Sequence, residues 1–527
     1  MGPGPMTRRP LSLCLVLSLP AVLVHATSAP TLDDALARVQ ALLESGDRAA
    51  ARSEVMRALR SFPSHPLLQN FLGVVEAQDD HYPAAEAAFR EAVRAAPRFT
   101  DAYVNLGRLY QENAGRDPDA VGKALAAYHA VLAYDPGHSE SLYQSAVLLQ
   151  ATGDFASSLE RLSRLPQDQQ ERAQVLGVRT AGELGAGHRA AAERAADALL
   201  ARPDLAEADV LTILPALAAH GGNDLGLRLL ERVRARGLIS AEGLQRLGTA
   251  YQGAGQLAAA RDALEAAAAA RPDSVAVLLD LARVAQQARD LRGALGYLAH
   301  ARELDPKDAR VHFLFGMVCV ELDLGVEAYN SLKEAVRLDP GNAAINYAMG
   351  AVCLHRRDPT EAVPFFRKYA ELEADDPRGA LAVGMAWFKA GEFMAARPEL
   401  ARAAQSPQTA AAAHYFLARI AREENDLDRA LELVEKALAA DPSYADAWAE
   451  RGLLHLRKRE REPAEKDLQR CLELEPDNYL GNLHLLALYQ RTRDARQEAQ
   501  EKRIEELKVL REQKAEEFRR VIEVRPN

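Results

Sequence analysis

The chain has 527 residues, of which 48% are hydrophobic, and its formal net charge is −10 at pH 7. That length corresponds to several ordinary globular domains or to one long array of repeats. An acidic chain lacks the positive surface that phosphate contacts require, so nucleic acid is not expected as a partner.

The N-terminus, residues 1–29, has the features of a secretory signal peptide. Two arginines precede an apolar run from Leu11 to Val24, which is shorter than the roughly 20 apolar residues that span a bilayer. Small residues follow, and we expect export to the periplasm or the exterior after cleavage near Ala26 or Ala29. An uncleaved N-terminal anchor is the alternative. No later segment is long and apolar enough to be a transmembrane segment.

The sequence after residue 240 repeats with a period of 34 residues. Steps of 34 from Gly248 reach only Gly or Ala, steps from Ala260 reach only Ala, and steps from Leu264 reach Leu, Phe or Val. Each unit therefore predicts two amphipathic helices, A and B, that approach most closely at the Gly or Ala of helix A and the Ala of helix B. A proline that recurs from Pro272 ends helix B.

Two short matches to catalytic or cofactor motifs have simpler interpretations. Residues 253–258 fit G-x-G-x-x-A, but a pyrophosphate loop follows a strand, and this stretch follows a predicted helix A. Residues 137–141 lack the last glycine of a nucleophile elbow and also follow a helix. We interpret the first as a turn between helices and the second as a turn and helix N-cap. We also find no H-E-x-x-H, and histidines such as His455 and His484 stand isolated. We therefore expect no catalytic, cofactor-binding or metal site, and no enzyme.

With these positions, the sequence resembles the tetratricopeptide repeat family, and it is similar to exported bacterial proteins that consist of an array of such repeats. The resemblance implies an all-α fold, a right-handed superhelical solenoid of about thirteen or fourteen helix-turn-helix repeats closed by a C-terminal capping helix. The expected organisation is N-terminal repeats over 30–138, divergent repeats over 139–239, a regular array over 240–490, and a charged capping helix and tail over 491–527. Pro166 comes early for the register in the divergent part, and Pro215 lies inside a helix A.

The resemblance also places helix A on the concave side of the solenoid. The residues three before and one after its Gly or Ala, and those three or four further on, then face a groove. In four successive repeats they form an apolar floor, rich in Met and aromatic residues, with a basic end. Exposed apolar surface of this kind marks a partner site; burial by a tight superhelix and a dimer interface are the alternatives. The partner-binding candidates are Phe313, Met317, Val320, Tyr347, Leu354, Leu381, Met385, Phe388, Tyr415 and Arg419.

The functional hypothesis is an exported scaffold or adaptor that binds a protein or peptide partner through this groove. The resemblance implies a role in cell-envelope assembly, secretion or polysaccharide export. A carbohydrate- or small-ligand-binding subunit of an envelope complex is the alternative, and self-association along the floor is a third hypothesis.

Cys319 and Cys353 occupy equivalent positions of adjacent repeats. A disulfide requires Cα atoms roughly 4.4–6.8 Å apart, which is closer than stacked repeats bring equivalent positions. We therefore expect buried free thiols, with a disulfide between repeats as the alternative.

Overall fold

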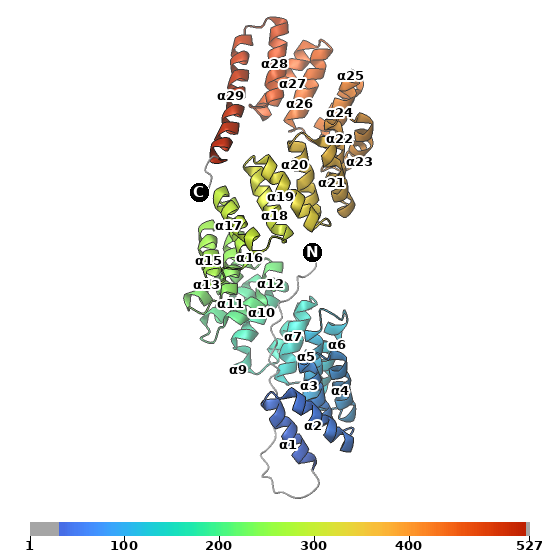
Figure 1. Ribbon diagram of the computed structural model, residues 1–527, viewed down its shortest axis with the longest axis vertical. Coiled ribbons are helices and arrows are strands. Elements are labelled where there is room, and N and C mark those ends of the chain that lie inside the picture. The colour runs from blue at the N-terminus through green and yellow to red at the C-terminus, as the bar shows by residue number, and fades with distance from the viewer. Residues whose placement is uncertain (1–30, 523–527) are drawn as a thin grey trace. The chain divides into compact units, whose positions relative to one another are not determined.

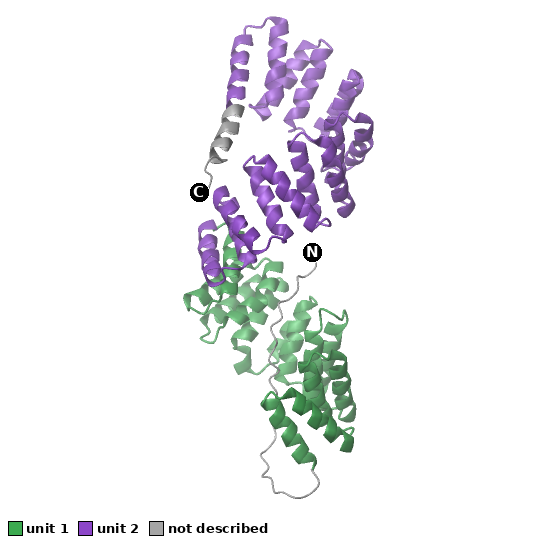
Figure 2. Ribbon diagram, viewed as in Figure 1, with its two compact units in different colours: residues 1–256 green, residues 257–527 purple. Residues whose placement is uncertain are grey.

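The computed structural model describes residues 31–522, with side chains as far as Leu510, and within that range the chain forms helices and no strands (Figure 1). The predicted signal peptide, residues 1–29, lies outside the described residues. The chain divides into two compact units, and the boundary in the sequence falls between Gln256 and Leu257 (Figure 2). The all-α repeat fold predicted from the 34-residue period is confirmed.

The first unit is a succession of helix pairs, each joined by a short turn, in which odd- and even-numbered helices alternate as A and B as far as α8. It contains α1 (Leu32–Glu44), α2 (Arg48–Ser61), α3 (Pro66–Gln78), α4 (Tyr82–Ala95), α5 (Thr100–Glu112), α6 (Ala120–Tyr134), α7 (Ser139–Ala151), α8 (Phe155–Ser163), α9 (Gln167–Gln170), α10 (Ala173–Gly185), α11 (Arg189–Ala201), α12 (Glu207–Ala219), α13 (Asn223–Ala235) and α14 (Ala241–Gly253).

In the second unit the even-numbered helices are A helices. It contains α15 (Leu257–Ala270), α16 (Val275–Gln287), α17 (Leu291–Leu304), α18 (Ala309–Glu321), α19 (Gly325–Leu338), α20 (Ala343–His355), α21 (Pro359–Leu372), α22 (Pro377–Lys389), α23 (Phe393–Ala403), α24 (Ala410–Glu423), α25 (Leu427–Ala440), α26 (Ala445–Arg457), α27 (Arg461–Leu474), α28 (Tyr479–Thr492) and α29 (Gln497–Ile522).

The turn from helix A to helix B has the same hydrogen bonding in most pairs. Between α7 and α8, Gly153 is left-handed with φ 81°, and its N–H donates to Gln150 O. The N–H of Asp154 donates to Leu149 O, and its carboxylate then caps α8. This arrangement satisfies the last carbonyls of helix A and the first N–H groups of helix B within three residues, so the two helices must fold back on each other.

The Gly position of helix A lies against helix B, as the period predicts. A Cβ on Gly316 would lie 2.7 Å from Leu332 Cγ and 3.3 Å from Ala328 O. The side chain of Leu332 and the backbone of Ala328 therefore both occupy the space beside this glycine. A Cβ on Gly350 would meet the ring of Phe366 at 2.7 Å. An added Cβ would make the same clash in four other pairs: Gly73–Phe89, Gly107–Tyr128, Gly384–Leu400 and Gly452–Leu468.

A side chain near the start of helix A ties many repeats to the one before. In α18, His312 Nε2 lies 2.9 Å from Pro306 O, and in α20, Asn346 Nδ2 donates to Pro340 O at 3.0 Å. The position is four residues before the Gly, and the acceptor is the carbonyl of the proline that ends the previous repeat. Gln69, Trp448 and Asn482 make the same bond. His312 is therefore a structural residue.

The divergent region keeps helix pairs but shortens one of them. Helix α8 has nine residues, and Pro166 is the N-cap of the single-turn α9. Leu162 and Leu165 come earlier than the repeat register predicts, yet both are buried in one core with Leu142 of α7. Their burial preserves a core across the break, because apolar contact rather than strict spacing holds the pairs together.

The last helix, α29, covers the end of the array. Ile504 and Leu507 are buried in the second unit, and Gln500 Nε2 donates to the side chain and main chain of Asn482 on α28. Such a charged outer helix is what the end of a repeat array needs. The predicted capping helix is confirmed as far as residue 522.

Candidate partner-binding groove

A hollow of about 480 Å³ opens on the A helices of the second unit. We call it the apolar pocket. Helix α18 contributes Phe313, Met317 and Val320, and α20 contributes Tyr347 and His355. The remaining lining residues are Ala344, Ala348, Ala351, Val352, Tyr369 and Arg378.

The wall of the apolar pocket is aromatic and partly open to solvent. The ring of Tyr347 makes edge contacts with Phe366 and Tyr369, with centroid distances of 5.4 and 4.9 Å. Tyr347 remains 38% exposed and Val320 40% exposed. This part of the floor is therefore accessible to another molecule without any rearrangement of the chain.

At one polar edge of the apolar pocket, the charged and polar side chains form hydrogen bonds with one another. Asp376 caps α22 and receives the guanidinium of Arg378 on both carboxylate oxygens, and the hydroxyl of Tyr369 donates to it. The hydrogen bond from Arg378 holds the pKa of Asp376 well below its usual range. Burial, together with the bond to Asp376, raises the pKa of Tyr369 to about 12. The edge is therefore an ionised carboxylate held by two donors.

At the other edge, His355 Nε2 lies 2.8 Å from Asp323 Oδ1. The polar groups at the edges of the apolar pocket thus already pair with their neighbours. An apolar group fits the hollow better than a charged one, because an unpaired charge would lose its hydration there.

Of the ten groove candidates, four line the apolar pocket: Phe313, Met317, Val320 and Tyr347. Leu354 is half-buried and packs on the core that contains Cys353 and Phe366.

The candidates further along the array pack together instead. Leu381, Met385 and Phe388 are half-buried against the core around α24 and α25. The ring of Phe388 lies 5.3 Å from that of Phe416, between centroids, and Arg419 stacks over it at 4.8 Å.

Tyr415 corrects the prediction of an exposed floor. Its ring is only 3% exposed, because it packs edge-on against Phe416 and Tyr444 at 5.2 Å from each. Burial raises the pKa of Tyr415 to about 12. The floor therefore closes between α22 and α24, where large aromatic residues fill the space that smaller ones leave open at α20.

The candidate list lacks seven of the lining residues: Ala344, Ala348, Ala351, Val352, His355, Tyr369 and Arg378. Ala344 and His355 extend the face of Tyr347 and Ala351 by one turn of α20 in each direction, at helical spacing. Following helix A over its full length would have found them. Arg378 holds the same position in α22 as Ala344 in α20. Tyr369 belongs to helix B, and no pattern within helix A could indicate it.

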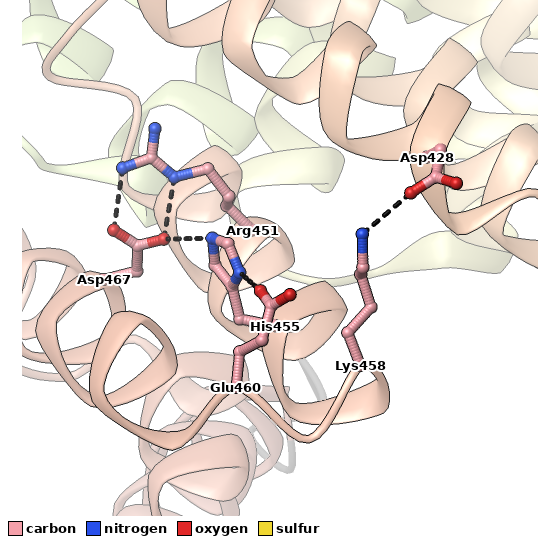
Figure 3. A network of polar contacts seen from close by, with 6 residues as sticks. All are labelled: Asp428, Arg451, His455, Lys458, Glu460 and Asp467. Atoms are coloured by element: carbon pink, nitrogen blue, oxygen red, sulfur yellow. Dashed lines mark hydrogen bonds and ion pairs between the residues drawn. The ribbon is translucent and has the colours of Figure 1, made fainter.

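His455 is not isolated, contrary to the sequence interpretation. Figure 3 shows it between two carboxylates, with Nδ1 2.6 Å from Glu460 Oε2 and Nε2 3.6 Å from Asp467 Oδ2. Arg451 donates two hydrogen bonds of 2.7 Å to Asp467, which is almost completely buried. Nearby, Lys458 pairs with Asp428.

This network joins α26, the helix A of one repeat, to α27, its helix B. The bond from Lys458 to Asp428 joins that repeat to α25 of the preceding one. A buried carboxylate needs such partners to offset the loss of hydration, which accounts for the cluster as a structural one. Across residues 31–510, no three His, Cys, Asp or Glu side chains are grouped so as to hold a metal ion.

The other chemical motifs are also structural. His138 is the N-cap of α7 and accepts the N–H of Ser141, which is completely buried, so the predicted turn and N-cap are confirmed. Residues 254–256 form the turn after α14, with Gly255 left-handed. Cys319 and Cys353 are free and buried, and burial raises the pKa of each thiol to about 12.

Comparison with known proteins identifies the repeat. One family model described as tetratricopeptide repeat matches residues 36–98, 327–377, 381–445 and 420–479, and a second with the same description matches 117–182 and 251–314. Together the matches cover more than half of the chain. It belongs to the tetratricopeptide repeat family. Tetratricopeptide repeats form scaffolds for protein–protein interaction, and this chain has that architecture.

Solved tetratricopeptide structures resemble it at low identity, and no curated protein matches the sequence. YrrB, described as a TPR protein with an unusual peptide-binding site, is 22% identical over 42% of this chain and 96% of its own, with a TM-score of 0.28. Yeast Tom70 is 16% identical over 85% and 96%, at 0.36. A tetratricopeptide repeat protein from Parabacteroides merdae is 18% identical over 47% and 98%, at 0.40. Within the described residues, no helix combines the length and apolarity needed to cross a membrane.

Proposed function

We propose that this tetratricopeptide protein is an exported scaffold whose apolar pocket holds an apolar side chain of a partner protein. The observation that carries the proposal is the open hollow lined by Met317, Phe313 and Tyr347, with edge charges that are already paired. Open apolar surface beside such a rim is typical of interaction sites, and methionine adapts to partners of different shape. Burying one Leu or Phe side chain contributes roughly 1.5–3 kcal/mol, which corresponds to about ten- to a hundredfold in affinity.

A matched pair of methionines tests the pocket. Met317 lines the hollow, whereas Met394, at the start of α23, is 80% exposed outside it. Proteins crosslinked to the wild type, Met317→Gln and Met394→Gln in the native host are compared by mass spectrometry. We expect at least one crosslinked protein to be lost from Met317→Gln and kept with Met394→Gln. Equal crosslinking of every protein in the three strains would contradict the proposal.

The setting we propose is the cell envelope, in assembly, secretion or polysaccharide export. Support comes from the basic and apolar stretches of residues 1–29 and from the family resemblance. Fusing residues 1–40 to a reporter enzyme that is active only outside the cytoplasm tests the export step. Activity should require the apolar run, and an inactive fusion that accumulates inside the cell would contradict export.

A second candidate function is the binding of a carbohydrate or another small ligand. The adjoining rings of Tyr347 and Tyr369 favour it, because aromatic faces present apolar area beside hydroxyl groups. A variant with serine in place of Phe313, Met317 and Tyr347 distinguishes the two functions. Phe388, another groove candidate, is left unchanged because it packs against the core. Sugar binding that vanishes while protein crosslinks persist would favour this second function.

A further inference from the structure

Three arginines lie further along the face that carries the apolar pocket. Arg419 occupies in α24 the repeat position that Met317 occupies in α18, three repeats of 34 residues earlier. Arg422 corresponds in the same way to Val320, and Arg457 of α26 corresponds to His355. Because Met317, Val320 and His355 all line the pocket, the repeat places the three arginines on the same face of the A helices.

One of these arginines, Arg422, pairs with a buried carboxylate. Glu450 of α26 is 5% exposed and pairs with Arg422 at 2.6 Å, and the charges of Arg419 and Arg457 also act on it. Burial raises the pKa of Glu450 despite these neighbours. Glu423 makes a second contact with Arg422 at 3.0 Å. Both carboxylates contact the guanidinium of Arg422. The guanidinium groups of Arg419 and Arg457 are left without an ion partner of their own.

Arg419 and Arg457 have no carboxylate within ion-pair distance in the described part of the chain. Arg419 is held in place by stacking over Phe388 and Tyr415, and its Nε is buried without an acceptor. Its contact with the Tyr415 hydroxyl is long, at 3.5 Å. Arg457 is exposed. A guanidinium carries five donors, so both groups have capacity for an anionic ligand.

We propose that Arg419 and Arg457, with Arg422 behind them, bind Asp or Glu side chains of the same partner segment whose apolar residue enters the apolar pocket. This inference rests on the proposed function and names the chemistry of its partner. Charge complementarity selects an acidic segment, since these arginines form a basic patch on a chain whose net charge is −10. Helices α20, α22 and α24 are successive A helices, and at roughly 10 Å for each step the two sites lie about 20 Å apart. An extended chain covers that distance with about six residues.

Selection from a random peptide library tests the inference without a known partner. The full chain is immobilised and challenged with displayed peptides of about 16 residues, which span both sites. We expect the wild type to enrich peptides with an apolar residue about six positions from Asp or Glu. The double variant Arg419→Gln with Arg457→Gln should lose the acidic preference and keep the apolar one. A selected acidic peptide should bind this variant about tenfold more weakly or worse, and salt should weaken its binding to the wild type.

Arg461→Gln is the matched control. Arg461 begins α27, a B helix, and lies four residues from Arg457, so the variant loses one charge from the same region but not from the groove face. Circular dichroism confirms that each variant is folded. The acidic preference should survive in Arg461→Gln, and its loss there would show a nonspecific charge effect and overturn the inference.

The outcomes separate the two proposals. Enrichment of apolar residues without acidic ones would overturn the arginine site and leave the apolar pocket standing. No enrichment from any library would contradict both. A single-stranded DNA oligonucleotide that binds through Arg419 and Arg457 more tightly than the selected peptides would assign the arginines to nucleic acid and overturn the acidic segment.

Discussion

Two glycines in the second unit isolate the energy of the contact between helices A and B. Gly350 of α20 lies against Phe366, where an added Cβ would stand 2.7 Å from the ring, whereas Gly296 of α17 is exposed and a Cβ there meets nothing within 4 Å. Alanine at either site stabilises the helix by about 1 kcal/mol. At Gly350 the ring must move, and such overpacking costs about 1–3 kcal/mol. We expect Gly296→Ala to stabilise by about 1 kcal/mol and Gly350→Ala to range from neutral to about 2 kcal/mol destabilised.

Hydrogen exchange is the suitable assay, because long repeat arrays do not unfold in one step and local stability is the quantity of interest. The amides of α20 and α21 should exchange faster in Gly350→Ala than in the wild type, and those of α17 should exchange more slowly in Gly296→Ala. The gain from helix propensity is common to both variants, so the difference between them measures the overlap alone. Equal protection changes of the same sign would refute the close-packing account.

Three further predictions concern turns, pH and thiols. Arg357 and Gly391 share the left-handed turn position of adjacent repeats, so Arg357→Gly should stabilise by up to about 1 kcal/mol and Gly391→Ala should destabilise by about 1 kcal/mol in denaturant titrations; the opposite signs would contradict the turn argument. Burial and two arginines lower the pKa of His484 to about 4, so its contribution to stability, up to about 3 kcal/mol, is complete above an unfolded pKa of about 6.5 and is lost as the pH falls toward 4. His484→Gln should flatten that part of the stability profile, and an unchanged profile would refute the assignment. Cys319, Cys353 and Cys471 are buried with raised pKa values, so native protein should react with a thiol reagent at pH 8 only as fast as it unfolds, and immediate labelling would show that they are accessible.

The helix pairs could be predicted because their signals are local and repeated. The Gly position, the Ala position and the Leu or Phe position each recur every 34 residues, and a periodic array needs only contacts between neighbours. Gly316 and Leu332 illustrate this, since one contact defined by spacing is made again in each repeat. The capping helix followed from the charged composition after residue 491.

The open and closed parts of the groove could not be predicted in the same way. Met317 and Arg419 hold equivalent positions, yet one lines a hollow and the other stacks on Phe388. The difference depends on the volumes of Phe416 in the same helix and of Tyr444 just before α26. The 34-residue recurrence of one position does not report the sizes of these other side chains. The network of His455 was missed for a related reason, because Asp467 belongs to the facing helix and Glu460 to the turn between them.

Photo-crosslinking from the apolar pocket tests the central claim most directly. A photoreactive phenylalanine analogue replaces Tyr347, which is 38% exposed in the pocket, or Met394, which is 80% exposed outside it. After irradiation in the native host, we expect a discrete protein adduct from position 347 that position 394 does not give. The adduct should contain an apolar residue of the partner at the crosslink. Identical products from the two positions, or none from position 347 in folded protein, would contradict the assignment of the pocket to a protein partner.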